Sequence, residues 1–124
     1  MSRKVLVIDD QPFMLKLISY NLRKTGYDVI TETDGLKALE RMEEIAPDLV
    51  VLDIRMPKIS GTELCVRLRE DVRFAEIPVI ILTSQLREDA EEAAMAAGAT
   101  DFMTKPFSPT ELLGKVDCYL NAKE

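Results

Sequence analysis

The chain has 124 residues, 47% of them hydrophobic, and a formal net charge of −6, which suits one domain with an ordinary apolar core. The negative charge and the scattered Lys and Arg residues argue against direct nucleic-acid binding, and the absence of histidine excludes His-based triads and His-ligated zinc. No apolar run approaches the roughly 20 residues of a membrane span and no signal-peptide pattern is present, so we expect residues 1–124 to form a single cytoplasmic domain without a membrane partner.

Five strand-like segments alternate with helical patterns, at residues 4–9, 28–32, 48–53, 78–83 and 100–105. The first, third and fourth contain the continuous apolar runs VLVI, LVVL and VIIL, typical of strands buried on both faces. The second and fifth are more polar, which places them at the edges. With right-handed crossovers, the pattern predicts an α/β fold: a flavodoxin-like doubly wound (βα)5 domain whose five-stranded parallel sheet has the order 2-1-3-4-5 and helices on both faces.

The boundaries of several helices are also predicted. Gly26 should end the first helix, Asp34 should cap the second, and Ser60 and Ser108 each begin a capping-box pattern. The helix after Asp34 should present three apolar residues on one face, namely Leu36, Leu39 and Met42. The segment 90–97 is rich in alanine, so its helix should bury little area and be loosely held.

The two cysteines, Cys65 and Cys118, fall within helical apolar patterns and form no CxxC motif. We therefore expect both to be small buried hydrophobic residues in a reducing compartment. They predict neither a disulfide nor a metal site.

Acidic residues end two of the central strands: Asp9 and Asp10 follow the first and Asp53 ends the third. In a doubly wound sheet, ligands bind beyond the carboxyl ends of the strands where the strand order reverses, so these carboxylates should converge. A single Asp can simply end a strand, and Asp10 could instead cap the helix that begins near Pro12. Two such charges about 4 Å apart repel by roughly 4 kcal/mol at an effective dielectric near 20. An oxygen-only site of this kind favours Mg²⁺, with Mn²⁺ as an alternative.

Two further polar residues end the neighbouring strands, Thr83 the fourth and Lys105 the fifth. Alone, each has an ordinary explanation, as a β-branched strand residue and a solvated lysine. Together with the acids they suit phosphoryl transfer, which needs a nucleophile, a metal and a cation for the phosphoryl oxygens. Asp53 is the best nucleophile candidate, because Asp9 and Asp10 share one strand end and can hold a metal jointly.

These segments resemble the receiver domain of two-component response regulators over essentially the whole chain. The matching pieces are the acidic pair after KVLVI and the stretches LVVLDIRMPKISG, VIILTS and GATDFMTKPF. The resemblance implies that Asp53 is the phosphoacceptor and forms an aspartyl phosphate. It also implies that Asp9, Asp10, Asp53 and the backbone carbonyl of Arg55 bind Mg²⁺.

The resemblance also assigns roles to the other strand ends. Thr83 and Lys105 would engage the phosphoryl group, and the Lys105–Pro106 peptide bond would be cis. Phe102 would be the switch aromatic, acting by size alone because it lacks the hydroxyl of tyrosine; a half-buried edge-strand aromatic is the alternative. Arg55 and Gln85 would flank the path of the water that removes the phosphoryl group.

The expected donor is a phosphohistidine on a sensor histidine kinase or a phosphotransfer protein. Phosphorylation would shift the face formed by the alanine-rich helix, the fifth strand and the last helix, which would control a downstream protein or a linked output domain. We expect a monomer or a phosphorylation-dependent dimer that catalyses only its own phosphorylation and dephosphorylation. A phosphohydrolase of the haloacid dehalogenase type is disfavoured, since Arg55 occupies the place of its second Asp. A degenerate receiver that only binds partners is the remaining alternative.

Overall fold

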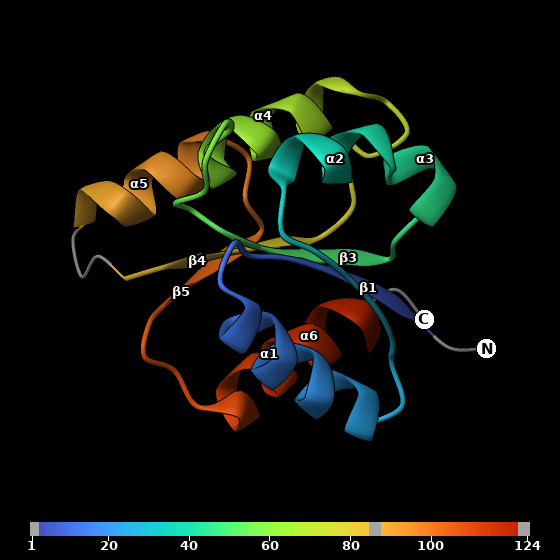
Figure 1. Cartoon of the computed structure of the whole chain (residues 1–124). Coiled ribbons are helices and arrows are strands. Elements are labelled where there is room, and N and C mark those ends of the chain that lie inside the picture. The colour runs from blue at the N-terminus through green and yellow to red at the C-terminus, as the bar shows by residue number, and fades with distance from the viewer. Residues whose placement is uncertain (1–2, 85–87, 122–124) are drawn as a thin grey trace.

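The computed structural model describes residues 3–84 and 88–121, which form a three-layer α/β fold around one parallel sheet (Figure 1). The sheet order is β2-β1-β3-β4-β5, which confirms the predicted fold class. The strands are β1 Lys4–Ile8, β2 Asp28–Glu32, β3 Leu49–Asp53, β4 Val79–Thr83 and β5 Asp101–Thr104. Four of the five are shorter than expected, because the expected terminal residues Asp9, Asp48, Pro78, Thr100 and Lys105 lie just outside the strands.

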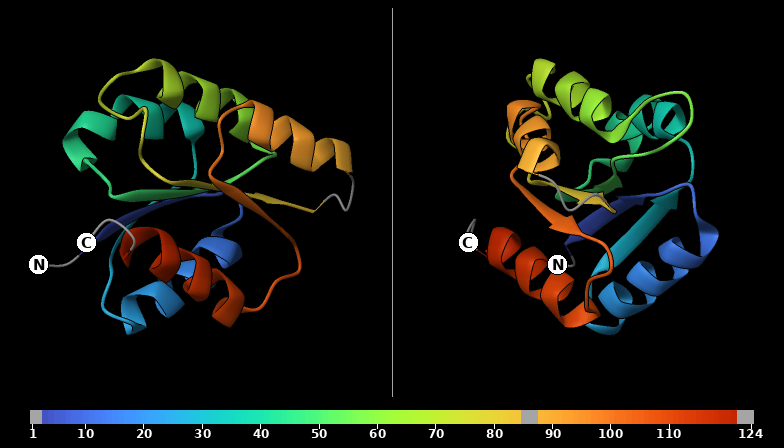
Figure 2. Two further views of the ribbon diagram at one scale, coloured as in Figure 1. Left: turned by 180° about the vertical axis from the view of Figure 1, so that it is seen from behind. Right: turned by 90° about the vertical axis from the view of Figure 1, so that its left-hand side faces the viewer.

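Helices cover both faces of the sheet (Figures 1 and 2). They are α1 Pro12–Lys24, α2 Gly35–Glu40, α3 Met42–Ile45, α4 Gly61–Glu70, α5 Glu88–Ala96 and α6 Pro109–Asn121. One face is covered by α1 and α6, and the other by α2, α3, α4 and α5. In the part of the chain that the structure describes, no helix combines the length and apolar character needed to cross a membrane.

Side chains on the central strands alternate between the two faces, as the two-residue period of a strand requires. In β1, Leu6 and Ile8 join the cluster under α2–α5, whereas Val5 and Val7 join the cluster under α1 and α6. The strands β3 and β4 alternate in the same way, and all these side chains are at most 1% exposed. Full burial of such a side chain contributes about 1.5–3 kcal/mol, so the sheet is a stiff frame for whatever its strand ends carry.

Three predicted helix caps form. Asp34 accepts hydrogen bonds from the backbone N–H groups of Leu36 and Lys37, and Ser60 accepts one from Glu63. Ser108 Oγ likewise accepts the N–H of Glu111 at 3.1 Å. Gly26 follows α1 with a φ of 102°, a left-handed conformation that glycine adopts without strain.

Two local expectations and one alternative interpretation are wrong. The helix after Asp34 divides into α2 and α3 at Arg41, and its inward face carries Ala38 rather than Leu36, which is 37% exposed. Asp10 does not cap α1, because the N-cap residue is Gln11, whose N–H is bound by Asp9 Oδ1 at 2.9 Å. Of the two cysteines, Cys65 is buried but Cys118 is exposed.

Candidate functional site

The acidic residues predicted from the sequence meet at the carboxyl ends of β1 and β3. These strands are direct neighbours and Ile8 pairs with Leu52, so the next residues, Asp9 and Asp53, lie beside each other. One carboxylate oxygen from each of Asp9, Asp10 and Asp53 lies within 4.8 Å of the others. Asp9 is fully buried, Asp53 is 7% exposed and Asp10 is exposed. The cluster is therefore reachable from solvent while its deeper members are held in the protein.

Lys105 reaches the same cluster from the end of β5. Its Nζ lies 3.1 Å from Asp9 Oδ2 and 3.3 Å from Asp53 Oδ1, so one ammonium bridges two carboxylates. The backbone N–H of Lys105 donates to the carbonyl of Thr83 at 2.6 Å, which ties the lysine to the end of β4. The Lys105–Pro106 peptide bond is cis. The two carboxylate contacts and the backbone bond to Thr83 place the lysine across the carboxyl ends of β1, β3 and β4.

The electrostatics of Asp53 follow from this arrangement. Burial is the main influence and raises the pKa of the Asp53 carboxyl above its ordinary value. The positive charge of Lys105 lowers it, whereas the charges of Asp9 and Asp10 raise it further. Since burial and the two acids outweigh the lysine, the charge of Lys105 does not fully balance the negative charge of ionised Asp53. The site thus favours an additional cation.

An open hollow of about 310 Å³ gives access to these groups. It is lined by Asp10, Gln11, Asp53, Arg55, Ser84 and Lys105. Gln11 and Ser84 were not predicted as site residues, although each directly follows a predicted one in the sequence. The hollow presents carboxylate, amide and hydroxyl oxygens together with an ammonium group, which suits a hard cation and a phosphoryl group.

Thr83 and Phe102, which were also predicted as site residues, do not line this hollow. Thr83 ends β4, is 1% exposed and pairs with Thr104 of β5. Phe102, earlier on β5, is partly buried and packs against the core cluster under α2–α5. Gln85 lies outside the described residues.

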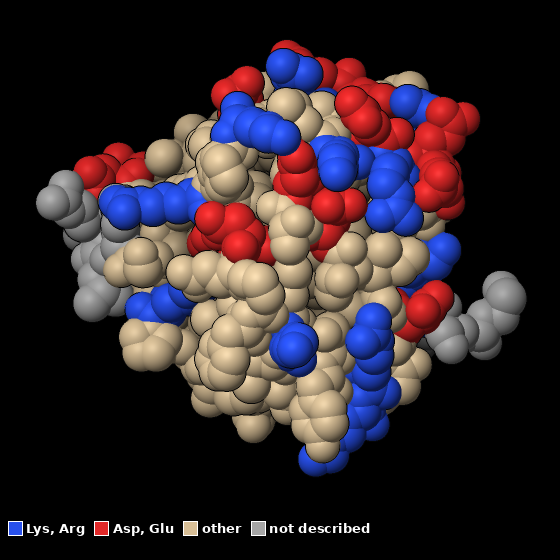
Figure 3. Space-filling view, in the orientation of Figure 1, with Lys and Arg blue, Asp and Glu red and all other residues tan. Residues whose placement is uncertain are grey.

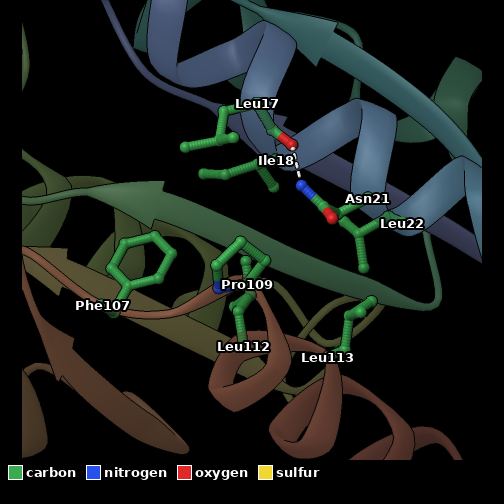
Figure 4. Close-up of a pocket in the computed structure, with 8 residues that line it drawn as sticks. All are labelled: Leu17, Ile18, Asn21, Leu22, Phe107, Pro109, Leu112 and Leu113. Carbon is green, nitrogen blue, oxygen red and sulfur yellow. Dashed lines mark hydrogen bonds between the residues drawn. The ribbon is translucent and has the colours of Figure 1, made fainter.

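A second hollow lies between α1 and α6 and has a different character (Figure 4). Leu17, Ile18 and Leu22 of α1 face Phe107 and Leu112 across a gap that is too narrow to admit a water molecule. Its lining contains no charged side chain. Unlike the acidic hollow, it is not lined by a carboxylate or an ammonium group.

The fold and the site together define a class of protein: a doubly wound domain with a cluster of three carboxylates at its switch point that could hold a cation. The family model described as "Response regulator receiver domain" matches residues 5–117, and the chain belongs to this family. It is a receiver domain of two-component response regulators, and its acidic pocket of Asp9, Asp10 and Asp53 is consistent with a magnesium-binding phosphoacceptor site.

Individual relatives agree with this assignment. The chain is 42% identical over 124 residues to the alkaline phosphatase synthesis transcriptional regulatory protein PhoP of Bacillus subtilis, covering all of this chain and 51% of that protein. A putative response regulator from Chloroflexus aurantiacus superposes with a TM-score of 0.94 at 32% identity, over 98% of this chain and 99% of the other. The receiver domain of the sensor histidine kinase PA1611 from Pseudomonas aeruginosa, described with a magnesium ion coordinated in its active-site cleft, gives a TM-score of 0.89 at 26% identity, over 98% and 99% of the two chains.

The chain spans about half the length of the curated relatives it matches. The receiver therefore corresponds to one part of those proteins.

Proposed function

We propose that Asp53 accepts a phosphoryl group from a phosphohistidine on a sensor histidine kinase or a phosphotransfer protein. In this step a carboxylate oxygen of Asp53 forms the new P–O bond as the P–N bond to the histidine breaks, and the imidazole leaves with the bonding electron pair. The observation that carries the proposal is the position of Asp53, which lines the open hollow and has the Lys105 ammonium 3.3 Å away. That ammonium is placed to stabilise the oxygens of an incoming phosphoryl group.

The donor set fits Mg²⁺, with Mn²⁺ as an alternative. Asp9, Asp10 and Asp53 supply carboxylate oxygens, and Arg55, which lines the same hollow, would add its backbone carbonyl. The bound ion would supply positive charge to the phosphoryl oxygens during transfer. The chain's own contribution is to hold the carboxylates close together before the ion arrives, at the cost of their mutual repulsion.

We further propose that Thr83, Lys105 and Phe102 transmit the change in charge at Asp53. Thr83 and Lys105 already share a backbone hydrogen bond, and Phe102 lies on the strand that Lys105 follows. A shift of these residues would alter the face formed by α5, β5 and α6, where a downstream protein or a linked output domain would bind.

Residues 1–124 would act as one receiver in this scheme, as a monomer or a phosphorylation-dependent dimer. PhoP is named a transcriptional regulatory protein, and the chain covers about half of it. If the present chain shares that architecture, control of transcription would belong to an output part outside the receiver, and the receiver itself would not contact nucleic acid.

The receiver would catalyse only its own phosphorylation and dephosphorylation. Arg55 stands two residues after Asp53, where a phosphohydrolase of the haloacid dehalogenase type needs a second Asp. Only residues 54–60 separate β3 from α4, which leaves no room there for a substrate-enclosing cap.

Intact mass after incubation with acetyl phosphate and Mg²⁺ tests the assignment. We expect one phosphoryl adduct on the wild type, no adduct on Asp53→Asn, and no adduct on the wild type when EDTA is added first. Asp101→Asn is the matched control, because Asp101 is another partly buried aspartate beside a lysine, and it should still be labelled. Persistent labelling of Asp53→Asn would refute Asp53 as the acceptor, and labelling in EDTA would refute the metal requirement.

A further inference from the structure

Lys58 forms an ion pair that none of the proposed chemistry uses. It lies in the loop between β3 and α4, and its Nζ is 2.9 Å from Asp34 Oδ2, at the N-terminus of α2. We propose that Lys58 is a positioning residue, whose ion pair with Asp34 fixes the loop that presents the Arg55 carbonyl to Mg²⁺. This inference rests on the proposed metal site and assigns a further residue to it.

The backbone at Lys58 is strained. Its φ is 73°, and among the described residues other than glycine only Ala46 shares a positive φ. The N–H of Ile59 donates to the carbonyl of Pro57 at 2.8 Å, so Lys58 is the central residue of a γ-turn. With a positive φ at its centre, this type of turn is rare and persists only where the surrounding structure enforces it.

Contacts on both sides of the turn enforce it. Before it, the N–H of Ile54 donates to Leu82 O at 2.8 Å, and the carbonyl of Ile54 accepts from Gly61 N at 2.9 Å. After it, Ile59 is 2% exposed and packs so closely over Gly35 that a Cβ there would lie 2.7 Å from Ile59 Cγ2. The backbone of Arg55 therefore lies between two held points, Ile54, which is bonded to β4, and the turn at Lys58.

Asp34 connects this loop to a helix. Its Oδ1 accepts the N–H groups of Leu36 and Lys37 at 2.9 and 3.3 Å, and its Oδ2 binds Lys58. The Asp34 side chain is 17% exposed, whereas the Lys58 side chain is 61% exposed. The better-buried and helix-anchored partner is thus the acid, and Lys58 ties the loop to it.

Order in this loop matters for a magnesium site. Mg²⁺ requires near-ideal octahedral geometry, and a carbonyl already held in place costs no ordering entropy on binding. Loss of the ion pair should loosen the segment between Ile54 and Ile59, which includes the Arg55 carbonyl, and so weaken Mg²⁺ binding. Simple electrostatics predicts the opposite for Lys58, because removing a positive charge near an acidic hollow should strengthen cation binding. Weaker Mg²⁺ binding after removal of the Lys58 charge would therefore indicate a positioning role, and tighter binding would indicate an effect of net charge.

The test is the dissociation constant for Mg²⁺, measured by isothermal titration calorimetry without a phosphoryl donor, together with urea unfolding in EDTA. An exposed ion pair couples weakly, so we expect Lys58→Met to weaken binding about threefold to fivefold. Lys58→Arg should retain wild-type affinity, because it can keep the ion pair. Asp34→Ser keeps a capping oxygen for α2 but cannot reach Lys58, and it should also weaken binding.

Two controls complete the design. The double variant Lys58→Met, Asp34→Ser should bind no more weakly than Asp34→Ser alone, since both changes break one interaction. Lys115→Met removes a similar Lys–Asp pair, 2.8 Å long, at the far end of β5, and it should leave the affinity unchanged.

The outcomes are distinct. Equal or tighter binding by Lys58→Met, in a wild type that binds Mg²⁺, overturns the positioning role and leaves the proposed function intact. A lower unfolding free energy with unchanged affinity also overturns it, because the pair would then be only structural. If the wild type binds no Mg²⁺, the proposed metal site fails and this inference falls with it.

Discussion

Replacing Asp53 with asparagine should stabilise the fold when no metal is bound. At an effective dielectric near 20, a charge 4.8 Å from Asp53 repels it by roughly 3.5 kcal/mol. Asp9 contributes more repulsion than Asp10, because Asp9 is buried whereas solvent screens the exposed Asp10. Lys105 at 3.3 Å attracts Asp53 by roughly 5 kcal/mol on the same scale. The desolvation of the carboxylate adds to the repulsion, and an asparagine oxygen can still accept from Lys105. We expect a gain of about 1–2 kcal/mol.

The assay is urea unfolding at pH 7 in EDTA, with the pH then lowered. The pKa of Asp53 in the folded protein lies above the ordinary value of 3.8, so the folded state binds a proton that the unfolded state has lost. The wild type therefore loses stability relative to Asp53→Asn as the pH rises from about 3.8 through the raised pKa. Above that pKa the difference stays constant. Mg²⁺ should narrow the difference, because a ligand that binds only the folded wild type stabilises it by mass action.

A loss of 1 kcal/mol or more in Asp53→Asn, under the same conditions, would refute this reasoning. It would mean that the Lys105–Asp53 attraction outweighs burial and the neighbouring acids. A difference between the two proteins that does not shrink as the pH falls toward 3.8 would also refute it, because the effect would then not come from the charge of Asp53.

Two further predictions concern the frame around the site. Gly61→Ala should destabilise the protein by about 2 kcal/mol and slow phosphorylation, because the new Cβ would clash with the backbone carbonyl oxygen of Asp53. Gly114→Ala is the control: its Cβ would meet open space, so the change should be neutral or stabilising by up to about 1 kcal/mol. Urea unfolding compares the two variants. Lys115→Met should lower the free energy of unfolding by about 1 kcal/mol at pH 7. Burial raises the pKa of the Asp101 carboxyl, but hydrogen bonds from Lys115 and Tyr119 outweigh burial, so the pKa lies below its ordinary value. The stabilisation by Lys115 is therefore lost as the pH falls through the pKa of Asp101 in the folded protein. Equal stability of the two glycine variants, or a Lys115→Met cost that persists at a pH below the pKa of Asp101, would contradict these expectations.

The central strands could be predicted because each contains a continuous run of apolar residues. Continuous apolar runs occur only where both faces of a strand are covered, and these runs coincide with β1, β3 and β4. The strand ends could not be placed as well, because the flanking residues Asp48 and Thr100 bond to the neighbouring strand through both backbone and side chain, although they lie outside the strands themselves. Asp48 Oδ2 accepts from Lys4 N at 2.7 Å, and Thr100 Oγ1 accepts from Val79 N at 3.0 Å.

The division of the second helix also had no sequence signal. The residue at the break is Arg41, which is not a helix-breaking Gly or Pro. The break coincides with hydrogen bonds from the Arg41 side chain to Glu32 on β2 and to Glu44. The bond to Glu32 depends on tertiary structure, which local propensity does not encode. The same limit applies to Lys58, whose partner Asp34 is 24 residues away and lies nearby only once α2 and α4 pack on the same face.

The acidic cluster itself was predictable because the topology determines it. Any doubly wound sheet of this order brings the ends of β1 and β3 together, so the residues after two apolar runs must meet. What the sequence could not give was the contact of Lys105 with both Asp9 and Asp53, which depends on the path of the chain after β5.

The bridge formed by Lys105 suggests how the site communicates with the rest of the domain. In the unmodified protein, the Lys105 ammonium contacts both Asp9 and Asp53, and this single positive charge does not balance the negative charge of the cluster. We expect a phosphoryl group on Asp53 to alter these two contacts, because it would add negative charge and bulk beside the Lys105 ammonium. The backbone of Lys105 is bonded to Thr83, and β5 immediately precedes it, so its displacement would act on β4 and β5. The stiff strands β1 and β3 would resist this movement, since their side chains are almost fully buried. The edge strand β5, with only one neighbouring strand, is the side on which the proposed switch can respond.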